Sequence, residues 1–148
     1  MLDLDRNFIG EIPSEIMRPS GGSHLTELYL SNNEITSIPD ELFQFQNVTH
    51  LWLSSNKTSS ALPSGLGMMK KLVELDLEHN FFTGAIPAEI YSLVNLQTLY
   101  LFDNILTGTF SPSFSQMKSL KILDLNTNYM SGLIPTQVGL LSQLAELQ

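Results

Sequence analysis

The chain has 148 residues, 43% of them hydrophobic, which suits one globular domain. Its formal net charge of −8 argues against binding of nucleic acid or direct contact with an anionic membrane, because both need clusters of Lys and Arg. The absence of cysteine excludes a small domain held by disulfide bonds, and no apolar run is long enough for a membrane-spanning helix.

The pattern L-x-x-L-x-L-x-x-N recurs along the chain. Full copies end in asparagine at 33, 56, 80, 104 and 128, and partial copies open the chain at Leu2 and close it at Leu144. The first step is longer than the others, and we expect its extra residues within 19–23. The spacing predicts a single domain, 1–148, of about six repeats at 1–24, 25–47, 48–71, 72–95, 96–119 and 120–143, with the start of a seventh at 144–148.

Each copy predicts a short strand with its leucines on one face, because side chains alternate along a strand. Stacked copies would form a parallel sheet over a continuous leucine core. An asparagine amide at the end of each strand can bond backbone groups inside the turn. The sequence therefore predicts a structural asparagine ladder of Asn7, Asn33, Asn56, Asn80, Asn104 and Asn128.

The second half of the repeat narrows the family. The pattern L-x-G-x-I-P is matched by residues 8–13 (FIGEIP), 82–87 (FTGAIP) and 130–135 (MSGLIP). The whole chain thus resembles the plant-type leucine-rich repeats of receptor-like proteins and receptor-like kinase ectodomains. The resemblance implies an α/β fold, a right-handed solenoid in a horseshoe arc. Its concave side would be a parallel sheet and its convex side short strands and 3₁₀ turns, with ligands on the concave or lateral surface.

Three repeats depart from that pattern. The second (35–39, ITSIP) is one residue short and lacks the glycine, and the fifth has Phe110-Ser111 in place of Ile-Pro. The third has Thr58 where an apolar core residue belongs and Ser60 where glycine belongs, which predicts a locally irregular convex side there. Neither terminal repeat carries a polar or cysteine-bearing cap, so we expect a piece of a longer solenoid.

Function is expected on the concave face, where variable residues flank the buried leucines. Nine of the 15 acidic residues fall on these positions (3, 5, 27, 74, 76, 78, 103, 124 and 146), against only Arg6 and Lys121 among the bases. Aromatic residues there are either binding anchors or cross-strand packing partners. The predicted concave face comprises Glu27, Tyr29, His50, Trp52, Glu74, Asp76, Glu78, Tyr100, Phe102, Asp103 and Asp124.

These residues predict a non-catalytic module that binds a protein or peptide with net positive charge and needs no cofactor. The plant-type resemblance places it on the extracellular side of a membrane-anchored parent protein. The alternative is a cytoplasmic or secreted adaptor or enzyme inhibitor built of repeats alone. A catalytic domain would have to lie outside these residues.

Two chemical alternatives are weaker. Ser55, His79 and Asp103 occupy one column in the order of a hydrolase triad, but an open sheet offers no oxyanion hole and no pocket that excludes water. Glu74, Asp76 and Glu78 alternate on one strand, which places neighbouring carboxylates roughly 6.6 Å apart and diverging. No metal site is expected, because calcium needs six to eight converging oxygens.

Two N-glycosylation sequons occur, at Asn47 and Asn56. A glycan on Asn56 would conflict with its expected place in the asparagine ladder. Asn47 precedes a strand at the surface and is the predicted acceptor.

Overall fold

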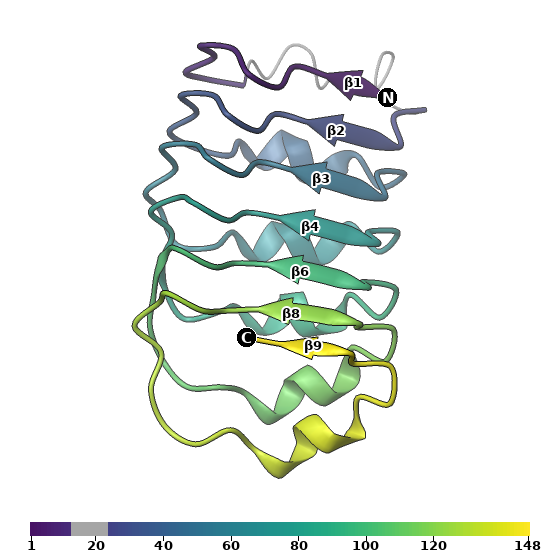
Figure 1. Cartoon of the computed structure of the whole chain (residues 1–148). Helices are drawn as coiled ribbons and strands as arrows, with labels where there is room; N and C mark the ends of the chain where they lie inside the picture. Colours follow the sequence, from purple (N-terminus) through teal and green to yellow (C-terminus); the bar gives the residue numbers. More distant parts are fainter. Residues whose placement is uncertain (13–23) are drawn as a thin grey trace.

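The computed structural model describes residues 1–12 and 24–148, so the extra residues expected at 19–23 lie outside the described part of the chain. Seven short strands stack in chain order into one parallel sheet (Figure 1). They are β1 (Leu2–Asp3), β2 (Glu27–Tyr29), β3 (His50–Trp52), β4 (Glu74–Asp76), β6 (Thr98–Tyr100), β8 (Ile122–Asp124) and β9 (Glu146–Leu147).

The register of the sheet follows the repeat. The central leucine of each strand lies beside that of the next, as in the pairs Leu28–Leu51, Leu51–Leu75 and Leu75–Leu99. These leucines are buried, while the residues on either side of them are partly exposed. The L-x-L spacing therefore places the leucines of β2, β3, β4, β6 and β8 in a single continuous core.

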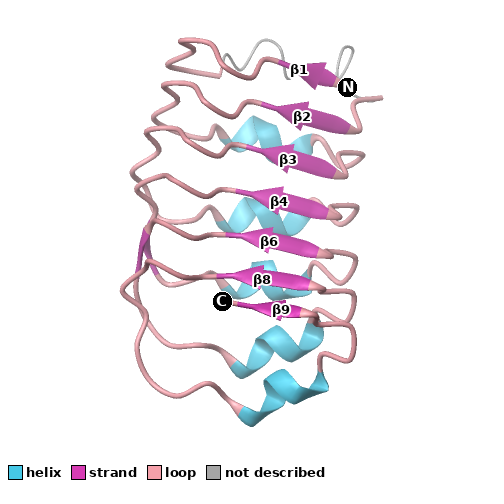
Figure 2. Ribbon diagram, in the orientation of Figure 1, coloured by secondary structure: helices cyan, strands magenta, loops and turns pink. Residues whose placement is uncertain are grey.

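Short 3₁₀ helices line the opposite side of the solenoid (Figure 2). Four of them begin directly after a proline with an extended backbone, and the fifth begins at Pro112 after Ser111, whose hydroxyl accepts a hydrogen bond from Ser113 N at 3.1 Å. One apolar residue of most of these helices enters the core, for example Leu66 and Ile90. The helices are η2 (Asp40–Gln44), η3 (Ser64–Met68), η4 (Ala88–Ser92), η5 (Pro112–Gln116) and η6 (Thr136–Leu140).

A second, two-stranded sheet joins β5 (Thr83–Gly84) to β7 (Ile105–Leu106) between the main sheet and the 3₁₀ helices. Gly84 and Gly108 adopt φ of +73° and +90°, the left-handed region that favours glycine. The third repeat, which has Ser60 at that position, reaches this sheet only through the isolated bridge from Ala61 to Thr83. Its convex side is irregular to that extent, yet η3 forms as in the other repeats.

Thr58 occupies the core position expected to be apolar. Its side chain is buried, and its hydroxyl donates to Ile35 O at 3.2 Å. Its own backbone N donates to Asn80 Oδ1. The hydroxyl is therefore satisfied inside the core, and the solenoid continues through the third repeat without interruption.

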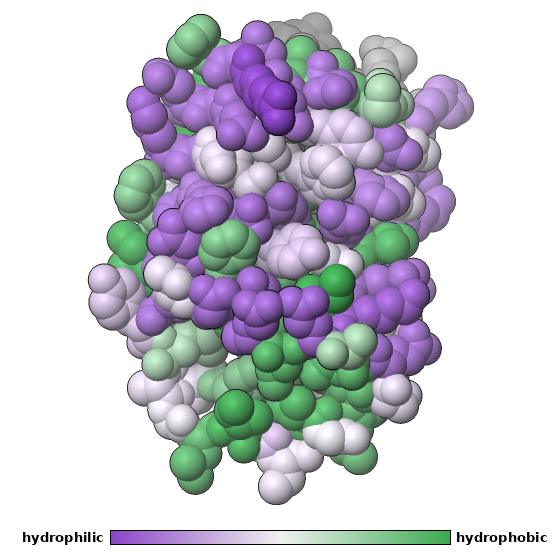
Figure 3. All heavy atoms as spheres, in the orientation of Figure 1, coloured by the Kyte–Doolittle hydropathy of each residue, from purple (hydrophilic) through white to green (hydrophobic). Residues whose placement is uncertain are grey.

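The surface seen in Figure 3 is mainly hydrophilic over the sheet and hydrophobic toward the C-terminal end. Leu133 is 90% exposed, and the exposed Ile134 and Leu147 line one hollow with it. Within residues 1–12 and 24–148, no helix is long and apolar enough to cross a membrane. The parallel sheet, the short second strands and the 3₁₀ turns confirm the solenoid that the repeat pattern predicted.

Candidate ligand-binding face

The sheet register aligns the concave-face residues in columns. The middle column runs across the strands through Tyr29, Trp52, Asp76, Tyr100 and Asp124. A second column, two residues earlier on each strand, runs through Glu27, His50, Glu74, Thr98 and Ile122. Side chains of both columns point away from the leucine core because strand residues alternate. Residues far apart in the sequence thus share one surface.

Tyr29 and Trp52 form a cross-strand aromatic pair, with ring centroids 4.5 Å apart and ring planes tilted by 38°. The Tyr29 hydroxyl donates to Glu27 Oε2 at 3.1 Å, and burial together with this carboxylate raises the pKa of Tyr29. Trp52 Nε1 is buried and has no hydrogen-bond partner among the described residues. Part of the aromatic surface is therefore used for packing within the sheet.

The C-terminal aromatic residues are arranged differently. The Phe102 ring meets the His79 ring edge-on at 4.6 Å, and His79 Nδ1 lies 2.6 Å from Asp103 Oδ2. Tyr100 makes no ring contact with another described aromatic residue. Ser55 makes no hydrogen bond to His79, so only two of the three residues of the triad alternative come together.

Carboxylates crowd the middle of the face. Asp76 Oδ1 accepts a hydrogen bond from Glu78 N at 3.2 Å. Burial raises the pKa of Asp76, and burial together with the negative charges of Asp76 and Asp124 raises the pKa of Glu78 to about 6. Apart from the His79–Asp103 pair, the carboxylates on this part of the described surface have no basic side chain in ion-pair contact. The face thus carries negative charge that is not neutralised internally.

Asp124 differs from the exposed position expected of it. The residue is only 7% exposed, and its Oδ1 accepts hydrogen bonds from Asn126 N at 3.0 Å and Asn126 Nδ2 at 2.7 Å. Its carboxylate already caps the turn that follows β8. Asp124 therefore contributes to the negative electrostatic potential of the face more than to the surface that a ligand could contact.

The asparagines at the strand ends bond neighbouring turns. Asn104 Nδ2 donates to Leu77 O and Leu101 O at 3.0 and 3.1 Å, and its Oδ1 accepts from Phe82 N at 2.9 Å. Asn33, Asn56, Asn80 and Asn128 repeat this geometry. Asn7 is exposed, and among the described residues its amide bonds only Leu4 O and Asp5 O of its own turn.

The two sequons lie in different surroundings. Asn56 is buried, and its amide nitrogen donates to two carbonyls of its own turn and to Leu30 O of the preceding repeat. Asn47 is partly exposed, and its Oδ1 accepts from Lys71 Nζ at 2.6 Å. No group of three or more His, Asp or Glu side chains in the described residues could hold a metal ion.

The residue that directly follows each ladder asparagine was absent from the predicted site. Phe81, Ile105 and Tyr129 are exposed and form a row on the lateral surface, beside His79 and Asp103. The signal in the sequence was an apolar residue outside the L-x-x-L-x-L-x-x-N core, which becomes visible only when the repeats are aligned beyond their asparagines.

Models of known families match most of the chain. A model described as "Leucine rich repeat" matches residues 1–57 and 23–82, and a second, "Leucine Rich Repeat", matches residues 95–117 and 119–141. Lumican of Gallus gallus is 41% identical over 81 residues, which are 53% of this chain and 22% of lumican. The chain therefore spans about a fifth of the length of that relative.

Two solved plant structures are similar over nearly the whole chain. The ectodomain of the Arabidopsis thaliana membrane receptor kinase GASSHO1/SCHENGEN3, in complex with CASPARIAN STRIP INTEGRITY FACTOR 2, is 35% identical with a TM-score of 0.90, covering 97% of this chain and 17% of that one. The Arabidopsis receptor kinase HAESA, in complex with the peptide hormone IDA and the co-receptor SERK1, is 33% identical with a TM-score of 0.86, covering 93% and 23%.

Proposed function

The chain belongs to the leucine-rich-repeat family, and we propose that it is a non-catalytic module that binds a protein or peptide of net positive charge on its concave face. The similarity to receptor ectodomains solved with a peptide hormone or a protein factor supports a ligand of this class. We place the module on the extracellular side of a membrane-anchored receptor. An adaptor or enzyme inhibitor made of repeats alone is the alternative.

One observation supports a positively charged ligand. The carboxylates of Glu74, Asp76 and Glu78 stand on and beside β4 without an ion-pair partner in the described chain, and burial and mutual repulsion raise the pKa of Glu78 to about 6. A Lys or Arg side chain placed between them would relieve this repulsion and gain charge-assisted hydrogen bonds. An anionic ligand would increase it.

Aromatic contact area accompanies the charge. Tyr100 lies beside Asp76 in the register, and Phe102 follows two residues later. Such side chains give rigid contact area at low entropic cost and are frequent anchors in binding surfaces. We expect Tyr100 and Phe102 to contact the ligand, with Trp52 held in place by Tyr29.

The test selects a displayed library of random dodecapeptides on the complete 148-residue chain. We expect the selected peptides to be rich in Lys and Arg, and their affinity to fall steeply with salt. Neutralising the β4 carboxylates in the triple variant Glu74→Gln/Asp76→Asn/Glu78→Gln should weaken binding at least tenfold. Removal of the aromatic anchors in Tyr100→Ala/Phe102→Ala should have an effect of similar size.

A matched control removes the same charge from the convex side. Asp40→Asn/Glu41→Gln/Glu89→Gln neutralises three exposed carboxylates on η2 and η4 and should leave affinity within about twofold, since those groups lie away from the sheet. Equal losses of affinity in both triple variants would mean that net charge, and not the position of the carboxylates, determines binding. Selection of acidic peptides, or of none, would contradict the proposal.

The predicted acceptor Asn47 remains our proposal for N-glycosylation. It lies at the start of the segment leading to β3, and its side chain is partly exposed. Mass spectrometry of the chain secreted from a eukaryotic host should find a glycan that Asn47→Gln abolishes. A glycan on Asn56 instead would contradict the proposal, because that amide is buried.

A further inference from the structure

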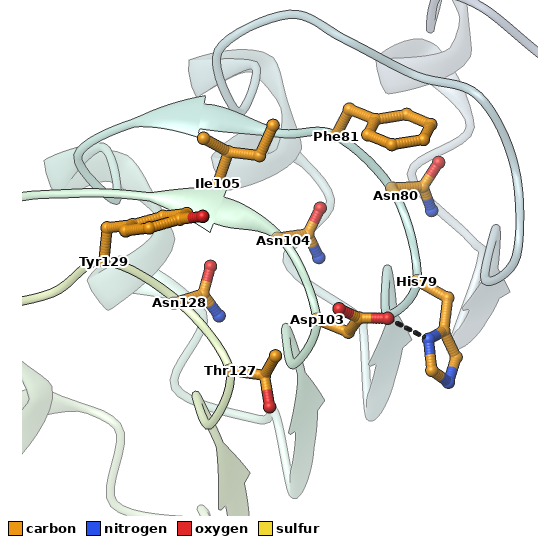
Figure 4. Close-up of a pocket in the computed structure, with 9 residues that line it drawn as sticks. All are labelled: His79, Asn80, Phe81, Asp103, Asn104, Ile105, Thr127, Asn128 and Tyr129. Atoms are coloured by element: carbon orange, nitrogen blue, oxygen red, sulfur yellow. Dashed lines mark hydrogen bonds and ion pairs between the residues drawn. The ribbon is translucent and has the colours of Figure 1, made fainter.

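A groove of about 500 Å³ crosses the lateral edge of the fourth, fifth and sixth repeats (Figure 4). Three parallel rows of side chains line it, one residue of each row coming from each repeat. We call it the lateral groove. Its rows are His79, Asp103 and Thr127; Asn80, Asn104 and Asn128; and Phe81, Ile105 and Tyr129.

The outer row is apolar and open to solvent. Phe81, Ile105 and Tyr129 are 49%, 40% and 70% exposed. The residues that follow the first two, Phe82 and Leu106, are fully buried, so the outer row points away from the core by strand alternation. Single exposed apolar residues are ordinary, but three in register on adjacent repeats form one continuous patch.

The amide donors on the floor of the groove are already used within the protein, so they are not available to a ligand rich in hydroxyl groups. Asn104 is bonded through both its amide nitrogen and its oxygen, and Asn80 and Asn128 are bonded in the same way. The backbone N–H groups of Phe81, Ile105 and Tyr129 all donate to carbonyls of the preceding repeat.

The inner row supplies the charge. The Asp103 carboxylate is half exposed, and one of its oxygens pairs with His79 Nδ1 at 2.6 Å. His79 in turn packs edge-on against Phe102 of the concave face, at 4.6 Å. The groove is therefore continuous with the concave face, and apart from His79 no basic side chain lines it.

We propose that the lateral groove is a specificity subsite that takes an apolar side chain of the peptide ligand, with an adjacent Lys or Arg paired to Asp103. The proposal rests on the proposed function for the class of ligand. The apolar row would cover the aliphatic or aromatic side chain, and the carboxylate would fix the basic neighbour. A glycan fits less well, because the amide donors of the floor are already engaged within the protein.

The test uses the peptides selected on the complete chain. Some selected peptides should combine an apolar with a basic residue. The variant Phe81→Ser/Ile105→Ser/Tyr129→Ser should lower the affinity for these peptides at least tenfold. The matched control Phe8→Ser/Leu133→Ser/Ile134→Ser removes three apolar side chains that are also exposed and lie outside the groove, and should leave affinity within about twofold. Equal urea midpoints for the two triple variants would show that the fold is not the cause.

Two further measurements report contact directly. The ¹³C δ-methyl resonance of Ile105 should shift when such a peptide is added, and should not shift with maltoheptaose. Asp103→Asn should lower the affinity for such a peptide by at least threefold. It should have no effect on affinity once the neighbouring Lys or Arg of that peptide is replaced by Gln.

The outcomes separate this subsite from the concave face. Loss of binding in the Glu74/Asp76/Glu78 variant but not in the groove variant leaves the proposed function intact and overturns the subsite. Loss in the groove variant alone overturns the concave assignment and keeps the subsite. An Ile105 shift caused by maltoheptaose and by no peptide, or a library that yields no binder, overturns the subsite.

Discussion

The second and third repeats, residues 25–71, and the fourth to sixth, residues 72–143, have the same sheet side and different outer sides. In both groups the strand leucines are buried and the ladder asparagines bond adjacent turns. The second sheet contains β5 and β7 of the later repeats only, where Gly84 and Gly108 stand at the turn. Ser60 occupies the equivalent place in the third repeat, which contributes a single bridge.

The lateral row differs in the same way. In the earlier repeats it holds Glu34 and Lys57, whose charges pair at 3.1 Å. In the later repeats it holds Phe81, Ile105 and Tyr129, which no other part of the described chain covers. The leucine and asparagine positions thus set the stacking, while the neighbouring positions vary freely and give each half of the solenoid its own surface.

The largest predicted effect concerns the asparagine ladder, which both groups of repeats share. Asn104→Leu would leave Phe82 N without its partner, and Leu77 O and Leu101 O would each lose one of the two amide hydrogen bonds that they accept. At roughly 1–3 kcal/mol for the unsatisfied Phe82 N and about 1 kcal/mol for each of the two lost hydrogen bonds, the free energy of unfolding should fall by about 4 kcal/mol. Asn56→Leu should cause a similar loss in the earlier repeats, since its bonds are the same.

Urea unfolding followed by circular dichroism measures both variants. Asn7→Leu is the internal control, because Asn7 is exposed and its hydrogen-bond partners within residues 1–12 and 24–148 are carbonyls of its own turn; the substitution should cost about 1 kcal/mol or less. A loss at Asn104 several times that at Asn56 would mean that the two halves are not equivalent on the sheet side.

The next effect concerns the outer side. Gly108→Ala places a β-carbon at φ of +90° and 3.2 Å from Ala85 Cβ, and should lower the free energy of unfolding by about 2 kcal/mol. Gly139→Ala, where an added β-carbon meets nothing within 4 Å, should be nearly neutral. Ser60→Gly should also change stability by less than about 0.5 kcal/mol, because the third repeat has no strand to complete there.

The sheet side could be predicted from the sequence because it depends on spacing alone. A fixed interval between asparagines sets which leucines become neighbours, and the L-x-L alternation sets which side chains face outward. The columns of the concave face could therefore be predicted from the sequence, although they join residues as far apart as Tyr29 and Asp124. The repeat boundaries themselves stay a prediction, since residues 13–23 lie outside the described chain.

Side-chain environment could not be predicted in the same way. The burial of Asp124 depends on the Asn126 side chain turning back to it, and the Tyr29–Trp52 pair depends on two rotamers. The lateral groove required knowing that Ile105 remains exposed while Leu106 is buried. These outcomes come from side-chain packing within a turn and between neighbouring repeats, which a one-dimensional pattern does not contain.

A smaller effect is expected in the turn before each ladder asparagine. All six residues at this position have φ between +52° and +57°, including the β-branched Thr127 in the later half and Asn32 in the earlier half. Asparagine tolerates this region better than threonine. Thr127→Asn should therefore raise the free energy of unfolding by about 1 kcal/mol, and Asn32→Thr should lower it by a similar amount.

Thermal melting of the two reciprocal variants checks this prediction. Opposite shifts of similar size would show that the turn is equivalent in both halves. A stabilisation by Thr127→Asn without the matching loss at Asn32 would assign the gain to some other contact of Thr127, such as its hydrogen bond to Asn126 Oδ1.

The smallest effect, a pH dependence, belongs to the later half of the concave face. The pKa of Glu78 is raised from 4.5 to about 6, chiefly by burial and then by the charge of Asp76. The folded state therefore holds this proton more tightly than the unfolded state, so the free energy of unfolding falls as pH rises from about 4.5 to 6. Glu78→Gln should flatten this slope, with Glu41→Gln on η2 as a control of equal charge change. The shift is modest because solvent screens the partly exposed carboxylate.

Binding of a cationic peptide should depend on pH in the opposite sense. Lys or Arg beside Glu78 stabilises the ionised carboxylate, so the affinity should rise as pH increases from 5 to 7 while the stability contribution of Glu78 declines. Isothermal titration calorimetry across this range should also detect proton release on binding near pH 6, which Glu78→Gln should reduce. An affinity that is the same at pH 5 and pH 7 would place the ligand away from Glu78, and the comparison would then leave only Glu74 and Asp76 as candidates on β4.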